Sequence, residues 1–208
     1  MKLSKSYWAL IKIIVFLVSL MPFALIIKAS ISNQLGPNPI EALHFYLGDW
    51  ALRFLCISLA LTPLKKIIKY SWPIRFRRMM GLFSFFYASL HFLVYISLDL
   101  SFSWDTFIDE VPQSPYILVG LFTYMLLTVL TLTSTKSMQK RLGKHWRKLH
   151  KLVYIAGISA VVHYLWLVKS DLSEPLLYAA IIIALLGFRL ITYFRTTPSP
   201  NIRSNRYE

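Results

Sequence analysis

Residues 79–98 read MMGLFSFFYASLHFLVYISL, and His91 is the one side chain in this stretch that can carry a charge near neutral pH. A helix needs about 20 mostly apolar residues to cross the hydrocarbon core of a membrane. Strands of a membrane barrel are shorter and alternate in polarity, and this run does neither. The stretch therefore predicts a membrane-spanning helix.

The rest of the chain repeats this pattern. Of its 208 residues, 56% are hydrophobic and 15% are charged, whereas soluble domains average roughly 45–50% and about 25%. Six apolar runs are predicted to span a membrane: 7–27, 45–64, 79–98, 116–133, 152–168 and 176–194. The expected fold is an all-α integral membrane protein, with one six-helix transmembrane domain over residues 1–195 and a mobile cytoplasmic tail over residues 196–208.

The first run has the alternative of a secretory signal peptide, because Lys2 and Lys5 precede an apolar stretch. The apolar stretch is too long for that role, and Lys28 stands where a small-residue cleavage site would be. We therefore interpret residues 7–27 as a retained first helix.

The charged residues predict the orientation. Most of the 23 Lys and Arg residues lie near the N-terminus, in 65–78, in 136–151 and after residue 194, whereas the acidic residues, Glu208 excepted, lie in or near the alternate connections. Basic loops face the cytoplasm, so both termini are predicted to be cytoplasmic. Lipid headgroups suffice to explain the basic segments, and no nucleic acid is needed. The external connection 99–115 is amphipathic and aromatic, and lies on the membrane surface or meets a partner.

Several classes of protein are excluded by simple counts. The single cysteine, Cys56, excludes an internal disulfide, a metal site built on paired cysteines and a haem attached through C-x-x-C-H. The seven glycines include no G-x-G, so the chain has neither a dinucleotide-binding fingerprint nor a P-loop.

Two histidines lie inside apolar runs, at matched depths. His91 follows Arg78, the last base before its run, by 13 residues, and His163 follows Lys151 by 12. Ionisable side chains inside a membrane span mark functional sites. Two imidazoles at one depth on the third and fifth helices are what bis-histidine ligation of haem iron requires. The alternative is a pair of interhelical hydrogen bonds; zinc or copper would need further ligands that this depth lacks.

Small side chains precede both histidines at helical spacing. They are Gly81, Ser84 and Ala88 before His91, and Ala156, Gly157 and Ala160 before His163. Such side chains leave room for a flat macrocycle, or they let two helices approach closely. Both interpretations stay open at this point.

His150 precedes His163 by 13 residues, about 20 Å along a continuous helix. It is a less certain third ligand, because the matching position on the third helix is Arg77, whose guanidinium binds a propionate or phosphate better than iron. Arg77, Arg78 and His150 therefore form an inner site for a second haem, a quinone or a flavin phosphate, or else a cluster that faces lipid headgroups.

Arg53 lies eight residues inside the second run, one helical turn after Asp49. It either forms a local ion pair with Asp49 or binds a haem propionate. His44 and His145 are expected at the membrane interfaces, where they would face solvent or headgroups.

Four stretches together resemble a known family. RRMMGLFSFFYASLH (77–91), STKSMQKRLGKHWRKLHKLVY (134–154), HYLW (163–166) and LTPL (61–64) are similar to the MsrQ (YedZ) family. These proteins are the haem-binding membrane subunits of bacterial periplasmic methionine sulfoxide reductase systems, within the wider ferric-reductase-like transmembrane group.

The resemblance implies a multi-pass protein of the bacterial inner membrane that carries b-type haem. It would pass electrons from the quinone pool or a cytosolic flavin reductase to a periplasmic molybdenum enzyme, MsrP. Family members are also associated with FMN. His91, His150 and His163 match the family's haem-related histidines, whereas Arg77 departs from the paired histidines of two-haem members of the wider group.

The chain has no dinucleotide-binding fingerprint, and its single cysteine, Cys56, lies inside a predicted span. These two features favour an electron-transfer subunit over a complete enzyme. Two other functions stay open. A stand-alone metalloreductase would reduce external ferric chelates without a partner. A haem-free scaffold would use its histidines only to join helices.

Overall fold

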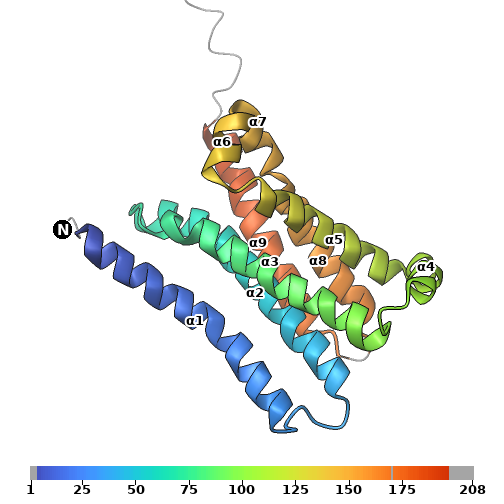
Figure 1. The fold of residues 1–208 in the computed structure, drawn as a ribbon. Helices are drawn as coiled ribbons and strands as arrows, with labels where there is room; N and C mark the ends of the chain where they lie inside the picture. Colours follow the sequence, from blue (N-terminus) through green and yellow to red (C-terminus); the bar gives the residue numbers. More distant parts are fainter. Residues whose placement is uncertain (1–3, 170, 197–208) are drawn as a thin grey trace, which may run out of the picture.

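The computed structural model describes residues 4–169 and 171–196. Every regular element in these two ranges is helical, as the sequence predicts (Figure 1). The elements are α1 (Lys5–Ile31), α2 (Pro39–Ile68), η1 (Pro73–Phe76), α3 (Arg77–Val94), η2 (Tyr95–Asp99), α4 (Trp104–Gln113), α5 (Pro115–Leu132), α6 (Lys136–Leu142), α7 (Lys144–Leu149), α8 (Leu152–Leu167) and α9 (Ser173–Thr196).

Five stretches of helix are long and apolar enough to cross a membrane. They are Lys5–Ile31, Pro73–Asp99, Pro115–Leu132, Lys144–Leu167 and Ser173–Arg195, and they contain or closely match five of the six predicted spans. The sixth span, 45–64, lies within α2, which has 30 residues but is not among the five. Six spans therefore remain a prediction, and five candidates are found.

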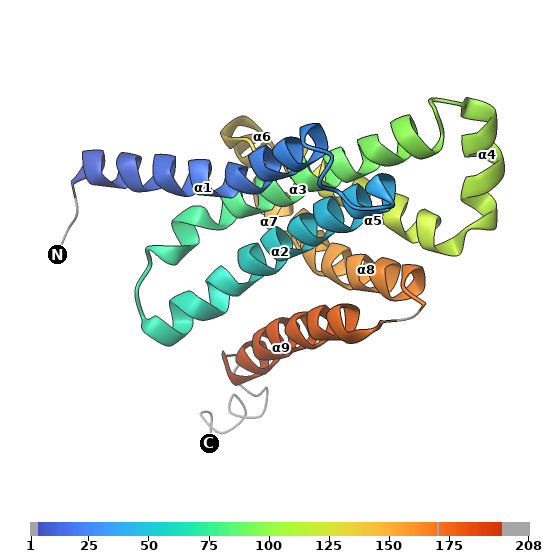
Figure 2. The same cartoon turned by 90° about the horizontal axis from the view of Figure 1, so that it is seen from below.

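Helix α2 is the centre of the molecule (Figure 2). It packs along α3 on one side and also contacts α1, α8 and α9, while α5 packs along α8. One buried cluster joins α2 to α5, α8 and α9, and Leu59 at its middle is fully buried. A second cluster joins α2 to α1 and α3. Two helix pairs, α2–α3 and α5–α8, therefore frame the interior.

A buried tyrosine ties α1 to this centre. Pro22 lies inside α1 and lacks an N–H, so the local hydrogen-bond ladder is interrupted. The fully buried Tyr87 of α3 donates its hydroxyl to the Ser19 carbonyl at 2.8 Å and accepts from the Phe23 N–H at 3.2 Å. A hydroxyl inserted in this way is a recognised cause of a bend in a helix.

The basic segments gather at one end of the bundle. The start of α1, the α2–α3 connection, α6, α7 and the last turns of α9 lie together, opposite the α1–α2 connection and α4 (Figure 1). This arrangement is the one that the charge pattern predicts. We call the two ends the basic end and the acidic end.

The expected external connection is largely helical. Helix α4 exposes Trp104 and Ile108, and its acidic side chains include Asp105 and Asp109. In the connection between α8 and α9, hydrogen bonding to the Ser173 side chain and to the Ser173 N–H, the latter at 2.9 Å, lowers the pKa of the Asp171 carboxyl. Of the tail predicted over residues 196–208, Thr196 is the last residue of α9, and residues 197–208 lie outside the described residues.

Candidate functional site

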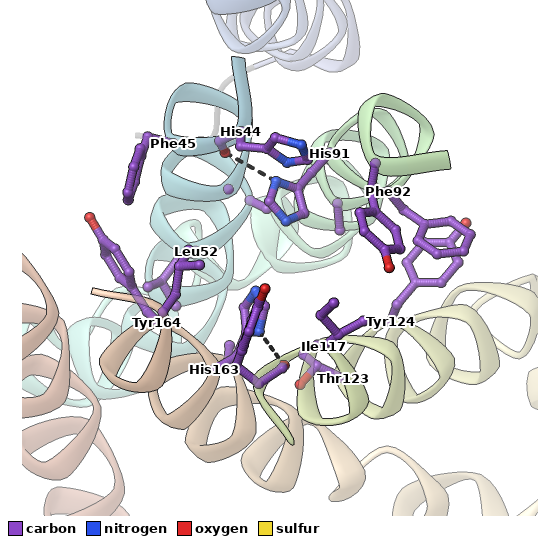
Figure 3. Close-up of a pocket in the computed structure, with 18 of the residues that line it drawn as sticks. His44, Phe45, Leu52, His91, Phe92, Ile117, Thr123, Tyr124, His163 and Tyr164 are labelled. Atoms are coloured by element: carbon purple, nitrogen blue, oxygen red, sulfur yellow. Dashed lines mark hydrogen bonds between the residues drawn. The ribbon is translucent and has the colours of Figure 1, made fainter. Parts of the chain in front are cut away.

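A cavity of about 510 Å³ lies between the two helix pairs, in the half of the bundle nearer the acidic end (Figure 3). Its wall is mainly apolar, with side chains from α2, α3, α5 and α8. His91 and His163 face each other across it, with ring centroids 6.2 Å apart and ring planes at 82°. The structure thus brings together His91 and His163, the two histidines that the sequence predicts at the same depth in the membrane.

Each imidazole is held by a backbone carbonyl. His91 Nδ1 lies 3.0 Å from the His44 carbonyl oxygen of α2, and His163 Nδ1 lies 2.7 Å from the Tyr116 carbonyl oxygen of α5. A carbonyl can only accept, so Nδ1 carries the proton in both rings and the lone pair is on Nε2. This second bond of the ring is the one that fixes tautomer and orientation in histidines that ligate metals.

A glycine lies beside each of these contacts, and only the one beside His163 is required by space. Gly48 and Gly120 are placed one turn after the accepting carbonyls. A Cβ on Gly120 would lie 2.8 Å from His163 Cε1 and 2.9 Å from Nδ1, whereas a Cβ on Gly48 would be 3.4 Å from His91 Nδ1. The two rings therefore lie directly against helix backbone.

The small residues before the histidines divide between both predicted roles. Ser84, Ala88 and Ala160 line the cavity. The other three serve helix packing: a Cβ on Gly81 would be 3.5 Å from Ser58 Oγ, Gly157 lies against Ile182 and Leu59, and Ala156 is fully buried in the core.

His44 departs from the expectation that it faces solvent or headgroups. It lines the cavity, with its ring edge-on to His91 at 5.1 Å between centroids and its Nε2 2.6 Å from Asp99 Oδ2. The reason is that α2 begins at Pro39, before the apolar run starts, so position 44 is already inside the helix bundle. His145 is exposed, in agreement with its expected position at an interface.

Arg53 forms the local ion pair that its spacing allows. Its Nη2 lies 3.0 Å from Asp49 Oδ2, and its Nε donates to Tyr178 Oη of α9 at 2.9 Å. Asp49 lines the cavity and Arg53 does not. A role for Arg53 toward a haem propionate stays a prediction.

His150 lies near the basic end, at the junction of α7 and α8, rather than on a helix continuous with His163. Its ring stacks on Trp146 at 4.1 Å between centroids. Its Nε2 is 3.1 Å from Thr133 Oγ1, whose own proton goes to the Val129 carbonyl at 2.7 Å. His150 therefore uses its Nε2 in a hydrogen bond to Thr133, whereas His91 and His163 bond through Nδ1 and leave Nε2 free.

The two arginines of the predicted inner site differ in environment. Arg77 is half-buried and close enough to His150 to interact electrostatically, whereas Arg78 is exposed. The structure adds Arg189 of α9, which also interacts with Arg77 and is half-buried. Sequence reasoning missed Arg189, although a lone base inside an apolar run is the same signal that identified His91.

Other metal sites find little support. Within residues 4–169 and 171–196, no group of three or more His, Cys, Asp or Glu side chains is placed to hold a metal ion. Cys56 is buried in α2.

Comparison with known proteins bears on this geometry. Residues 47–161 match the model of the ferric reductase like transmembrane component family. A protein of Xanthomonas euvesicatoria pv. vesicatoria, named protein-methionine-sulfoxide reductase heme-binding subunit MsrQ, is 45% identical over 177 residues, which is 81% of each chain. The protein of the same name from Herminiimonas arsenicoxydans is 42% identical over 184 residues, 87% of this chain and 84% of that protein. The chain belongs to the MsrQ family.

Membership of the MsrQ family and five apolar helices together make the chain a multi-pass membrane protein. They also make it a membrane electron-transfer subunit, since the matched family is ferric-reductase-like. The family match spans α2 to α8 and therefore covers both helix pairs that frame the cavity, up to two residues before His163.

Proposed function

We propose that the chain is a b-type haem electron-transfer subunit, and that His91 and His163 would hold the haem in the cavity. The observation that carries the proposal is the separation of the two rings, 6.2 Å between centroids. Two imidazoles that bind one iron through Nε2, with bonds of about 2 Å, hold their centroids about 6 Å apart. The names of the relatives, heme-binding subunit, support the same assignment.

The protein residues orient the two imidazoles and surround the site with apolar side chains, and the haem would supply a reversible one-electron change at iron. The His44 and Tyr116 carbonyls hold the imidazoles in one tautomer and make Nε2 a stronger donor. Small side chains leave space between the helices, while the apolar wall keeps water from the site. No group of the wall needs to change place when an electron arrives or leaves.

The direction of transfer follows from where the cavity lies. Its lining extends to Glu41 and Asp99 at the acidic end, which the charge pattern places outside the cytoplasm. We propose that electrons enter from the quinone pool or a cytosolic flavin reductase and leave to a periplasmic molybdenum-dependent methionine sulfoxide reductase (MsrP), at the bacterial inner membrane. The relatives' names, which refer to methionine sulfoxide reductase, support this partner.

The inner site remains part of the proposal. Arg77 and His150, with the exposed Arg78 near the surface, would hold a second haem, FMN or a quinone. A haem ligated by His150 requires its bond to Thr133 to break, or Nδ1 to serve as the ligand. Arg53 would reach a propionate of the outer haem only by leaving Asp49 or Tyr178.

The test is a dithionite-reduced minus oxidised visible spectrum of the purified chain, with haem counted per polypeptide. We expect a b-type signal that His91→Ala and His163→Ala each abolish in protein that is still folded. His145→Ala is the matched control, because His145 is exposed, and should leave the signal unchanged. A colourless wild type, purified with haem supplied, would overturn the proposal and favour the scaffold.

The same preparation tests the partner. The reduced chain should be reoxidised by purified MsrP with methionine sulfoxide, and only slowly by ferric chelates. Fast reduction of ferric chelates with no response to MsrP would instead identify a stand-alone metalloreductase.

A further inference from the structure

Arg189 reaches across the bundle to a carbonyl that α2 cannot satisfy by itself. Pro63 lies inside α2 and has no N–H, so the Leu59 carbonyl four residues earlier has no helical partner. Arg189 Nη2 donates to the Leu59 oxygen at 2.5 Å. Nη2 of the guanidinium thus replaces the backbone hydrogen bond that Pro63 cannot make in α2.

The other half of the guanidinium has no such use. Nη1 of Arg189 is buried and has no hydrogen-bond partner among the described residues. The guanidinium carbon lies 5.0 Å from the ring centroid of Tyr154, a cation–π contact that attracts the charge but gives Nη1 no hydrogen-bond acceptor. A buried donor without a partner is costly, and more so when it carries charge.

The local charge is also unbalanced. The Arg77 carbonyl accepts a hydrogen bond from Ser58 Oγ at 3.1 Å, and Ser58 directly precedes Leu59, so Arg77 of α3 and Arg189 of α9 both contact the same turn of α2. In the part of the chain that the structure describes, every carboxylate belongs to the other half of the molecule. Two guanidinium groups in an apolar region therefore lack a protein counter-ion, and such charges are normally paired.

We propose that Arg189 and Arg77 bind a phosphate group at the basic end of the bundle. Two forked guanidinium donors match the charge and the oxygen geometry of a phosphate ester. The phosphate belongs either to an anionic phospholipid headgroup of the inner leaflet or to a soluble phosphate compound. This site shares Arg77 with the inner site proposed above and rests in part on that proposal, but it is separate from the His91–His163 cavity and does not depend on whether haem binds there.

The experiment uses the full chain, purified in detergent and stripped of lipid. Its thermal unfolding is followed in sodium phosphate and in sodium chloride at equal ionic strength. Retention of phosphatidylglycerol against phosphatidylcholine is counted by native mass spectrometry. Phosphate-dependent stabilisation identifies a soluble source; selective retention of phosphatidylglycerol without it identifies the lipid.

The variants separate ligand binding from the repair of α2. Arg189→Gln should weaken the response to the effective probe about tenfold or more, whereas Arg141→Gln, at an exposed arginine of α6 at the same end, should not. Because Arg189→Gln alone leaves the Leu59 carbonyl unpaired, it is also made with Pro63→Ala, which restores the N–H that this carbonyl lacks. The double variant should fold and still lack the response.

Three results would overturn the inference. The wild type could respond to neither probe. The double variant could bind as the wild type does, which would leave Arg189 only its role at Leu59. Arg189→Gln could lose haem with unchanged phosphate and lipid binding, which would assign the charge to a propionate.

Discussion

At the scale of single residues, the site depends on backbone groups as much as on the two histidines. The carbonyls of His44 in α2 and Tyr116 in α5 orient the two imidazoles. One turn after each carbonyl, a glycine without a side chain lies beside the ring. The two glycines are not equally constrained, because His163 lies closer to Gly120 than His91 lies to Gly48. This difference can be measured.

Gly120→Ala should lower the haem content of the purified chain severely. The new Cβ would lie 2.8 Å from His163 Cε1, so the ring must move and its bond to the Tyr116 carbonyl must lengthen or break. Gly48→Ala is the matched control, with ordinary van der Waals contacts to His91, and should keep most of its haem. Haem per polypeptide after purification is the measurement, and equal haem content in both variants would contradict the geometry.

The same residues show what sequence reasoning can reach. His91 and His163 were predictable because each is a lone polar side chain in an apolar run. The His44 and Tyr116 carbonyls were not, since every residue has a carbonyl and only the packing of α2 on α3 and of α5 on α8 selects these two. His44 was assigned to the surface because its helix begins earlier than its apolar run. Arg189 was overlooked, although its position in the last run was visible.

At the scale of the elements, interrupted helices explain several long-range contacts. Pro22 lies inside α1 and Pro63 lies inside α2. Near each proline, a side chain from another helix donates a hydrogen bond to a backbone carbonyl: Tyr87 to Ser19 in α1, and Arg189 to Leu59 in α2. The long apolar helices were predictable from composition, but the start of α2 was not, because the helix begins at Pro39, before its apolar run. The partners of the interrupted backbone were not, because they come from distant positions.

Tyr87→Phe should destabilise the chain by about 1–3 kcal/mol, the usual effect of leaving buried backbone groups without their partner. The Ser19 carbonyl and the Phe23 N–H both lose the hydroxyl that joins them, and α1 loses a tie to α3. Thermal unfolding in detergent measures the effect. Tyr70→Phe, at an exposed tyrosine, should change the midpoint little, and an equal shift in both variants would show that the bridge carries no stability.

At the scale of the whole molecule, the two helix pairs repeat one design. His91 and His163 are 72 positions apart, and so are Gly48 and Gly120, and the carbonyls of His44 and Tyr116. Each pair thus places a carbonyl, a glycine and a histidine at the same spacing, 47 residues from carbonyl to imidazole. The apolar pattern hides this repeat, because few other side chains match.

The opposed ends of the bundle predict which surface an external reagent can reach. Gln113→Cys in α4 should react with a membrane-impermeant maleimide in intact cells, and Ser137→Cys in α6 only after the membrane is opened. Both positions are exposed, and the natural Cys56 is buried and should stay silent. The reverse labelling pattern would invert the orientation.

If His91 and His163 held a ferric haem as proposed, the angle of 82° between their imidazole planes would affect the electronic structure of the iron. Each ring donates π density to the iron d orbital that its own plane selects. Perpendicular rings therefore raise the energies of two iron d orbitals almost equally, whereas parallel rings raise the energy of only one. With the two nearly degenerate, orbital angular momentum is not quenched, and the low-spin electron paramagnetic resonance spectrum becomes strongly anisotropic, with one dominant low-field feature. A well-resolved rhombic spectrum would mean that the rings turn toward each other when the metal is bound.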